Sequence, residues 1–144
     1  MTVDTRKTKF GRIFPPREDW LAKAPAEPII DPTLPIIDTH HHLWQRLGGG
    51  AGDSWEVPSF RYLLHEFLAD CATGHNVVGS VFLQCHAMYR KDGPEQMRPV
   101  GETEFVAGIA AMSDSGGYGP CRVAEGIVSG GDLTSMTEKL NAEP

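Results

Sequence analysis

Apolar residues along the chain follow two spacings, and together these predict strands alternating with helices. The segment PIIDTH (35–40) is a short apolar run entered through a proline, which suits the start of a strand. NVVGSVFLQC (76–85) is almost continuously apolar, as expected of a strand buried on both faces. CRVAEGIV (121–128) is predicted as a third strand. These starting points put the strand–helix units about 40 residues apart.

Helical spacing lies between the predicted strands. In the first such stretch the apolar residues recur every three or four positions, at Phe60, Leu63, Leu64, Phe67, Leu68 and Cys71. Ser59 is a suitable N-cap for this helix, and Gly74 is expected to end it. A second helix is predicted over 102–113, with acidic residues at its start. SMTEKLNAEP (135–144) is predicted to begin another helix.

Proline placement separates an N-terminal arm from the rest of the chain. Residues 1–34 carry five prolines among charged residues, and proline fixes φ and removes a backbone donor, so an extended arm is predicted there. Residues 35–144 are predicted to form one domain, because 144 residues are enough for a single core.

Charge and cysteine content narrow the classes of partner. The formal net charge is -6 and no cluster of Lys and Arg occurs, which argues against a nucleic-acid or anionic membrane partner. No apolar run is long enough for a signal peptide or a membrane span. The chain has three cysteines, Cys71, Cys85 and Cys121, and they form no CxxC pair. An odd number of widely spaced cysteines does not suggest a disulfide framework, so a reducing cytoplasm is expected.

Three strand–helix units are compatible with two folds. They are typical of the first part of a (β/α)₈ barrel, and a small open α/β sheet gives the same alternation. Periodicity alone leaves both open. A complete barrel takes about 250 residues, so this chain has room for about three of the eight units.

Three consecutive histidines follow the first apolar run. Because side chains alternate along a strand, Asp38, His40 and His42 are expected on one face and His41 on the other. Two imidazoles on one face can converge on an ion beyond the strand end, at Zn–N distances of about 2.0–2.1 Å. A catalytic zinc usually has three protein ligands and a water, so His40 and His42 supply only part of such a site. Histidines near strand ends also serve simply as hydrogen-bonding residues.

Several segments taken together resemble a known family. PIIDTHHHLW, the stretch from RYLLHEFLAD to GETEFVAGIAAM (61–112), and GYGPCRVAEGIV are similar to the N-terminal part of the amidohydrolase-related family of metal-dependent TIM-barrel hydrolases. This family includes dicarboxylate lactonases and decarboxylases. The resemblance extends from about Leu34 to Leu133, and its most specific feature is the HxH of the first strand joined to the AMYR to GETEFV segment.

The resemblance implies a partial (β/α)₈ barrel of about the first three units. It implies that His40 and His42 bind a divalent metal ion, with zinc expected first. The implied reaction is hydrolysis of an amide, an ester or a lactone by metal-activated water, with decarboxylation as an alternative chemistry of the same superfamily. The base that family members carry on a later strand has no counterpart here, so no catalytic base is assigned.

Substrate-binding candidates follow the second predicted strand. His86 and Arg90 are candidates for an anionic carbonyl substrate, since Arg suits bidentate recognition of a carboxylate. Two positions depart from what the family tends to carry. Gln84 stands where a Glu is usual, and Gly130 stands where a GHADL-like segment has its histidine.

The chain diverges from the resemblance soon after Leu133 and ends at Pro144. We therefore expect a truncated chain that is inactive alone. The alternative from a different functional class is a non-catalytic fragment that self-associates or complements a missing C-terminal part. The predicted third strand (121–128) would supply the unpaired edge for such a contact, and a homo-oligomer would be one result.

Overall fold

The computed structural model describes residues 18–25, 27–46 and 60–131. The chain divides into two compact units, one made of Met1–Pro28 with Gln45–Arg61 and the other of Ile29–Trp44 with Tyr62–Pro144. The first unit contains the short helix α1 (Glu18–Leu21). It also contributes most of β2 (Trp44–Arg46) and β3 (Phe60–Tyr62), which pair in a two-stranded sheet.

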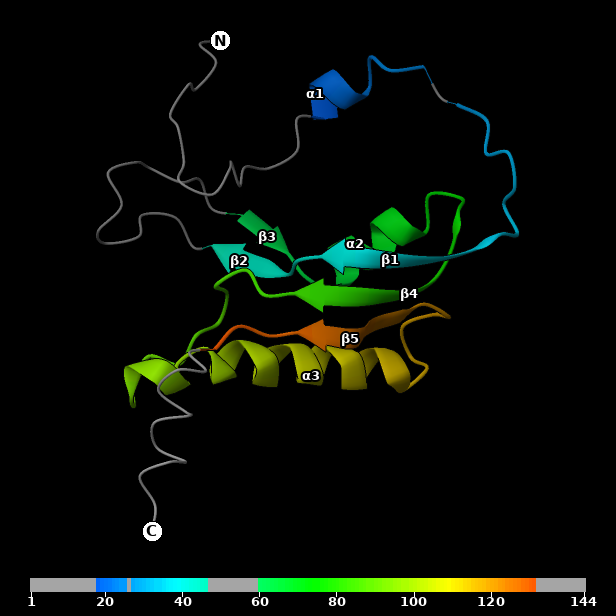
Figure 1. Cartoon of the computed structure of the whole chain (residues 1–144). Helices are drawn as coiled ribbons and strands as arrows, with labels where there is room; N and C mark the ends of the chain where they lie inside the picture. Colours follow the sequence, from blue (N-terminus) through cyan, green and yellow to red (C-terminus); the bar gives the residue numbers. More distant parts are fainter. Residues whose placement is uncertain (1–17, 26, 47–59, 132–144) are drawn as a thin grey trace. The chain divides into compact units, whose positions relative to one another are not determined.

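The second unit is built on a three-stranded parallel sheet. Its strands are β1 (Pro35–His41), β4 (Asn76–Leu83) and β5 (Arg122–Val128), in the order β1-β4-β5 (Figure 1). The central strand β4 is the one predicted to be buried, and Ser80 and Phe82 in it are each 1% exposed. Since all three strands run in parallel, their carboxyl ends lie at one end of the sheet.

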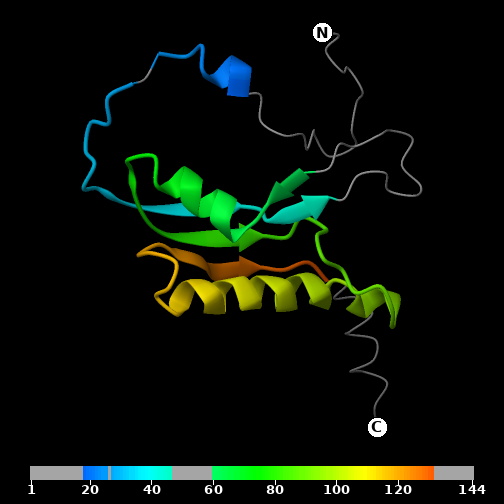
Figure 2. The same cartoon turned by 180° about the vertical axis from the view of Figure 1, so that it is seen from behind.

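Helices α2 (Leu64–Cys71) and α3 (Val100–Asp114) and the short 3₁₀ helix η1 (Glu95–Met97) complete this unit. Figure 2 shows α2 against β1 and β4, and α3 alongside β5. Both helices contribute to one apolar core, which comprises Leu43, Leu64, Phe67, Phe82, Val106, Ile109, Cys121, Val123 and Ala124. A single core therefore holds the sheet and its two helices together.

The prediction of a partial (β/α)₈ barrel is wrong. The described residues form a small open α/β sheet, the other fold that the strand–helix alternation allows, with β1 and β5 as its edges. The alternation of strands and helices along the chain reflects local burial and is the same in both folds. Closing a barrel requires further strands that pair with the two edge strands. No barrel-like arrangement exists in the part of the chain that the structure describes.

Element boundaries differ from the predictions at the start of α2 and within the N-terminal arm. The helix expected from Phe60 onward begins at Leu64, because 60–62 pair with β2 as a strand and Leu63 is extended. Glu66 caps this helix by accepting the Leu63 N–H at 3.0 Å. The predicted extended arm contains one helical turn, Glu18–Leu21. Ser59 and the helix expected over 135–144 lie outside the described residues.

Among the described residues, no helix is long and apolar enough to cross a membrane.

Candidate metal centre

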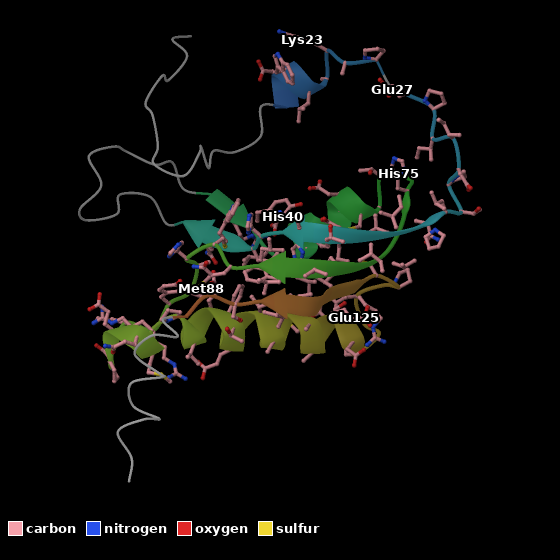
Figure 3. The ribbon with its side chains drawn as sticks, in the orientation of Figure 1. Lys23, Glu27, His40, His75, Met88 and Glu125 are labelled. Atoms are coloured by element: carbon pink, nitrogen blue, oxygen red, sulfur yellow. The ribbon has the colours of Figure 1, made fainter. Side chains whose placement is uncertain are left out.

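The side chains of His40 and His42 meet at the carboxyl end of β1. Their Nε2 atoms are 3.3 Å apart and their rings are nearly perpendicular, at 89°. His40 is exposed and His42 is half-buried, with its ring stacked on Trp44. The strand alternation predicted that these two imidazoles share a face, and this is confirmed. Figure 3 labels His40 on β1 and His75 near the opposite end of the sheet.

The backbone of β4 fixes the orientation of His42. Its Nδ1 lies 2.8 Å from the carbonyl oxygen of Leu83. Because a carbonyl oxygen only accepts, Nδ1 must carry the proton, and the lone pair of the neutral ring is then on Nε2. This arrangement is typical of metal-binding histidines, whose second nitrogen donates to a carbonyl or carboxylate.

The separation of the two Nε2 atoms fits a shared ion. Two Zn–N bonds of about 2.0–2.1 Å at a tetrahedral angle place their nitrogens about 3.3–3.4 Å apart, which matches the observed 3.3 Å. The same separation is longer than most hydrogen bonds, which lie at about 2.7–3.2 Å. Among the described residues, no cluster of three or more His, Cys, Asp or Glu side chains could hold a metal ion. The two imidazoles alone thus fall short of the three protein ligands usual for a catalytic zinc.

His41 lies on the other side of β1, inside the core. It is 5% exposed, its Nδ1 lies 3.0 Å from the Val81 carbonyl oxygen, and its ring packs 4.4 Å from that of Phe67. Burial lowers the pKa of His41, although the hydrogen bond to Val81 opposes this. His41 is thus a core residue that anchors the strand next to His40 and His42.

The carboxylate of Asp38 turns back onto its own strand. Its Oδ1 accepts the His40 N–H at 3.0 Å. The pairing of β1 with β4 shifts register between Asp38 and His41, so the simple alternation that placed Asp38 beside the two imidazoles does not continue through this stretch. Asp38 therefore shapes the backbone that presents His40.

His86 and Arg90 lie in the loop that follows β4, at the same end of the sheet as the histidine pair. His86 has a left-handed backbone, with φ of 63°, and its ring centroid is 5.5 Å from that of Tyr89. Residues other than glycine rarely adopt a positive φ, and those that do concentrate at functional sites. Arg90 forms an ion pair with Glu104, and its Nε also donates to that carboxylate at 3.1 Å. To bind a substrate carboxylate, Arg90 would have to release the carboxylate of Glu104.

Glu102 holds this loop, whereas from the sequence it was predicted only as one of the acidic residues at a helix start. It is 2% exposed, and its Oε1 accepts the backbone N–H groups of Cys85 at 3.0 Å and Ala87 at 2.7 Å. These two amides flank His86, so the buried carboxylate fixes the left-handed residue between them. A signal was present, because Glu102 lies on the same buried helical stripe as Val106 and Ile109.

The two positions that depart from the family lie in contact. A Cβ atom on Gly130 would be 2.8 Å from Cδ of Gln84, so the Gln84 side chain occupies the space beside this glycine. Gln84 also donates from Nε2 to the hydroxyl oxygen of Tyr89 at 2.6 Å. The sequence alone placed the two departures 46 positions apart, and the fold brings them together.

Gly130→Ala should therefore displace Gln84 and break its bond to Tyr89. Burial raises the pKa of the Tyr89 phenol, and the hydrogen bond from Gln84 opposes that rise because it stabilises the phenolate. Losing this bond should raise the Tyr89 pKa further. The measurement is a spectroscopic titration of the tyrosines, with Gly131→Ala as the control, since a Cβ there meets nothing within 4 Å. An unchanged Tyr89 titration in Gly130→Ala would contradict the contact.

The comparisons with known proteins add no relative to this description: no family model, no curated protein and no solved structure matches the chain. The resemblance to the amidohydrolase-related family remains a prediction from the quoted segments.

Proposed function

We propose that this chain binds a divalent metal ion, zinc first, through Nε2 of His40 and His42. The observation that supports this proposal most directly is the 3.3 Å separation of these nitrogens, with His42 held by the Leu83 carbonyl. We further propose, from the family resemblance, that the bound ion serves hydrolysis of an amide, an ester or a lactone.

The ion, when bound, would polarise a substrate carbonyl and make a water molecule more acidic. The chain's own residues supply binding and orientation. The Leu83 carbonyl keeps the lone pair of His42 Nε2 directed toward His40, while Glu102 keeps His86 at the same end of the sheet. His86 and Arg90 are the proposed contacts for an anionic carbonyl substrate. No residue is assigned as the base.

The same proposal places the chain in the cytoplasm. The three cysteines are free thiols in the structure, and free thiols persist in a reducing compartment. A small anionic carbonyl compound is the proposed partner, and the negative net charge gives no support to a nucleic acid.

Metal binding is tested first by zinc titration calorimetry and by metal content after purification. We expect wild-type chain to bind zinc, and His42→Ala to lose at least about 100-fold in affinity, because loss of even an outer-sphere partner costs about 10–100-fold. His75→Ala is the matched control, since His75 is exposed and near the opposite end of the sheet (Figure 3). Equal zinc affinity in wild type and His42→Ala would overturn the proposal.

Hydrolysis is tested separately on the metal-loaded chain with a panel of lactones, activated esters and amides. Turnover that disappears in His40→Ala, together with the metal, would support a hydrolase. Release of carbon dioxide from a carboxylate substrate would instead indicate the decarboxylase alternative. Zinc binding without turnover of any substrate would agree with the expectation that this chain is inactive alone, and would reject hydrolysis by the chain itself.

Self-association is a second candidate function, favoured by the open edge of the sheet. Strand β5 ends the sheet on one side, as predicted, and its last residue Val128 is 53% exposed. Unpaired strand edges readily add further strands. Size-exclusion chromatography with light scattering should then show a concentration-dependent dimer or larger species, and a monomer at all concentrations would exclude this candidate.

A further inference from the structure

The candidate metal centre holds only part of the ligand set that zinc takes. A structural zinc site is a tetrahedron of four nitrogen or sulfur ligands, and a catalytic site usually has three protein ligands and a water. Within the described ranges, the centre consists of His40 and His42, whose Nε2 atoms are 3.3 Å apart. These two nitrogens form one edge of a tetrahedron, and the opposite edge has to be supplied.

The fold leaves no further imidazole or thiol of the same chain to supply it. All six histidines and all three cysteines lie within the described ranges, and all of them belong to the second compact unit. Within these ranges, no group of three or more His, Cys, Asp or Glu side chains could hold an ion. His41, next in the sequence, is buried in the core and bonds through Nδ1 to the Val81 carbonyl. Additional nitrogen ligands must therefore come from another molecule.

The histidine pair lies where another molecule can reach it. Strand β1 is an edge strand of the three-stranded sheet, so that sheet pairs with only one of its sides. His40 is exposed, and Ile37 in the same strand is an apolar residue with 59% exposure. His42 is held by the Leu83 carbonyl, with its Nε2 near that of His40. An ion on these two nitrogens would thus lie beside an exposed side chain of an edge strand.

We propose that two copies of the chain share one zinc ion, each copy contributing Nε2 of His40 and of His42. The inference rests on the proposed function, because the same pair must bind zinc. A second copy fits the open positions because it brings an identical pair of nitrogens, already spaced for a second edge of the tetrahedron. The two pairs would be related by a two-fold axis through the ion, and two-fold symmetry is the commonest in protein dimers.

Sharing the ion would regulate the same site. Four imidazoles fill the tetrahedron and leave no position for water, which is the arrangement of a structural zinc site and not of a catalytic one. The dimer is therefore the closed form, and hydrolysis by the metal-loaded chain would belong to the monomer. The ion also joins two chains that each carry a formal net charge of -6, and its positive charge offsets part of their repulsion.

The test removes metal from the full chain with EDTA and then titrates it with zinc chloride. Light scattering follows the molar mass, and calorimetry gives the number of zinc ions bound per chain. We expect zinc to double the molar mass measured in EDTA and to saturate at one ion per two chains. Adding EDTA again should restore the starting mass.

His40→Ala is the main variant, because the exposed His40 side chain can be removed with little effect on packing. Denaturant unfolding in EDTA verifies that the variant folds. It should weaken the zinc-dependent association at least about 100-fold, since each dimer loses two ligands and loss of even an outer-sphere partner costs about 10–100-fold. His75→Ala is the matched control and should dimerise like wild type, because His75 is exposed near the opposite end of the sheet (Figure 3).

The outcomes separate this inference from the proposed function. Zinc bound at one ion per chain with no increase in molar mass would overturn the shared site and leave zinc binding intact, with water or carboxylates in the other positions. A zinc-dependent dimer that persists in His40→Ala would also overturn it, because the bridging ligands would then lie elsewhere. Absence of zinc binding would reject the proposed function and this inference together.

Discussion

Gly101→Ala should be among the most destabilising single-methyl additions in the described part of the chain. A Cβ atom there would lie 2.6 Å from the Met88 carbonyl oxygen and 2.7 Å from the Arg90 nitrogen. Both are backbone atoms, and the Arg90 N–H is already bonded to the Arg98 carbonyl at 3.0 Å. Neither can withdraw without disturbing the loop after β4, so we expect unfolding free energy to fall by about 3 kcal/mol.

Gly108→Ala, in the same helix, should raise the free energy of unfolding instead of lowering it. A Cβ atom at Gly108 meets nothing within 4 Å, and the position is exposed. Replacing glycine by alanine inside a helix should therefore stabilise the chain by about 0.5–1 kcal/mol. Denaturant unfolding of the two variants gives the comparison. A similar loss of unfolding free energy in both variants would mean that the α3 backbone, and not the contact between Gly101 and the loop after β4, determines the loss.

Local burial made the three long strands predictable from the sequence. The apolar segments that begin at 35, 76 and 121 each form a strand that starts within one residue of the predicted position. Apolar residues that favour strands are buried by a sheet of either fold, so their pattern locates the strands without specifying the fold. The short strands β2 and β3 carry only three residues each, too few to show a period. Whether the sheet stays open or closes depends on strand pairing, which local spacing does not encode.

The candidate site divides in the same way. The meeting of His40 and His42 was predicted from alternation along one strand, although β1 ends at His41 and its register shifts after Asp38, so that Asp38 does not join them. The role of Glu102 was not, because the amides that it accepts become neighbours only when His86 adopts a left-handed backbone.

Glu102→Ala should destabilise the chain by about 3 kcal/mol or more. Removing the carboxylate leaves the Cys85 and Ala87 N–H groups without their acceptor at a buried site, and each such group costs about 1–3 kcal/mol. Glu102→Gln keeps an acceptor oxygen and should lie between wild type and alanine. Glu104→Ala is the matched control, since that carboxylate is exposed in its ion pair with Arg90 and should matter far less.

The thiol of Cys85 reports whether the loop itself has opened. Burial, and after it the nearby Glu102 carboxylate, raises the pKa of Cys85 to about 12, so its alkylation at pH 8 should be slow in wild type. In Glu102→Ala the carboxylate is gone and an opened loop would bury Cys85 less, so both causes of its raised pKa weaken. Under conditions where this variant is still folded, alkylation of Cys85 should accelerate at least tenfold, while Glu104→Ala keeps the wild-type rate. Unchanged alkylation together with unchanged stability would mean that the loop after β4 holds its left-handed turn without Glu102.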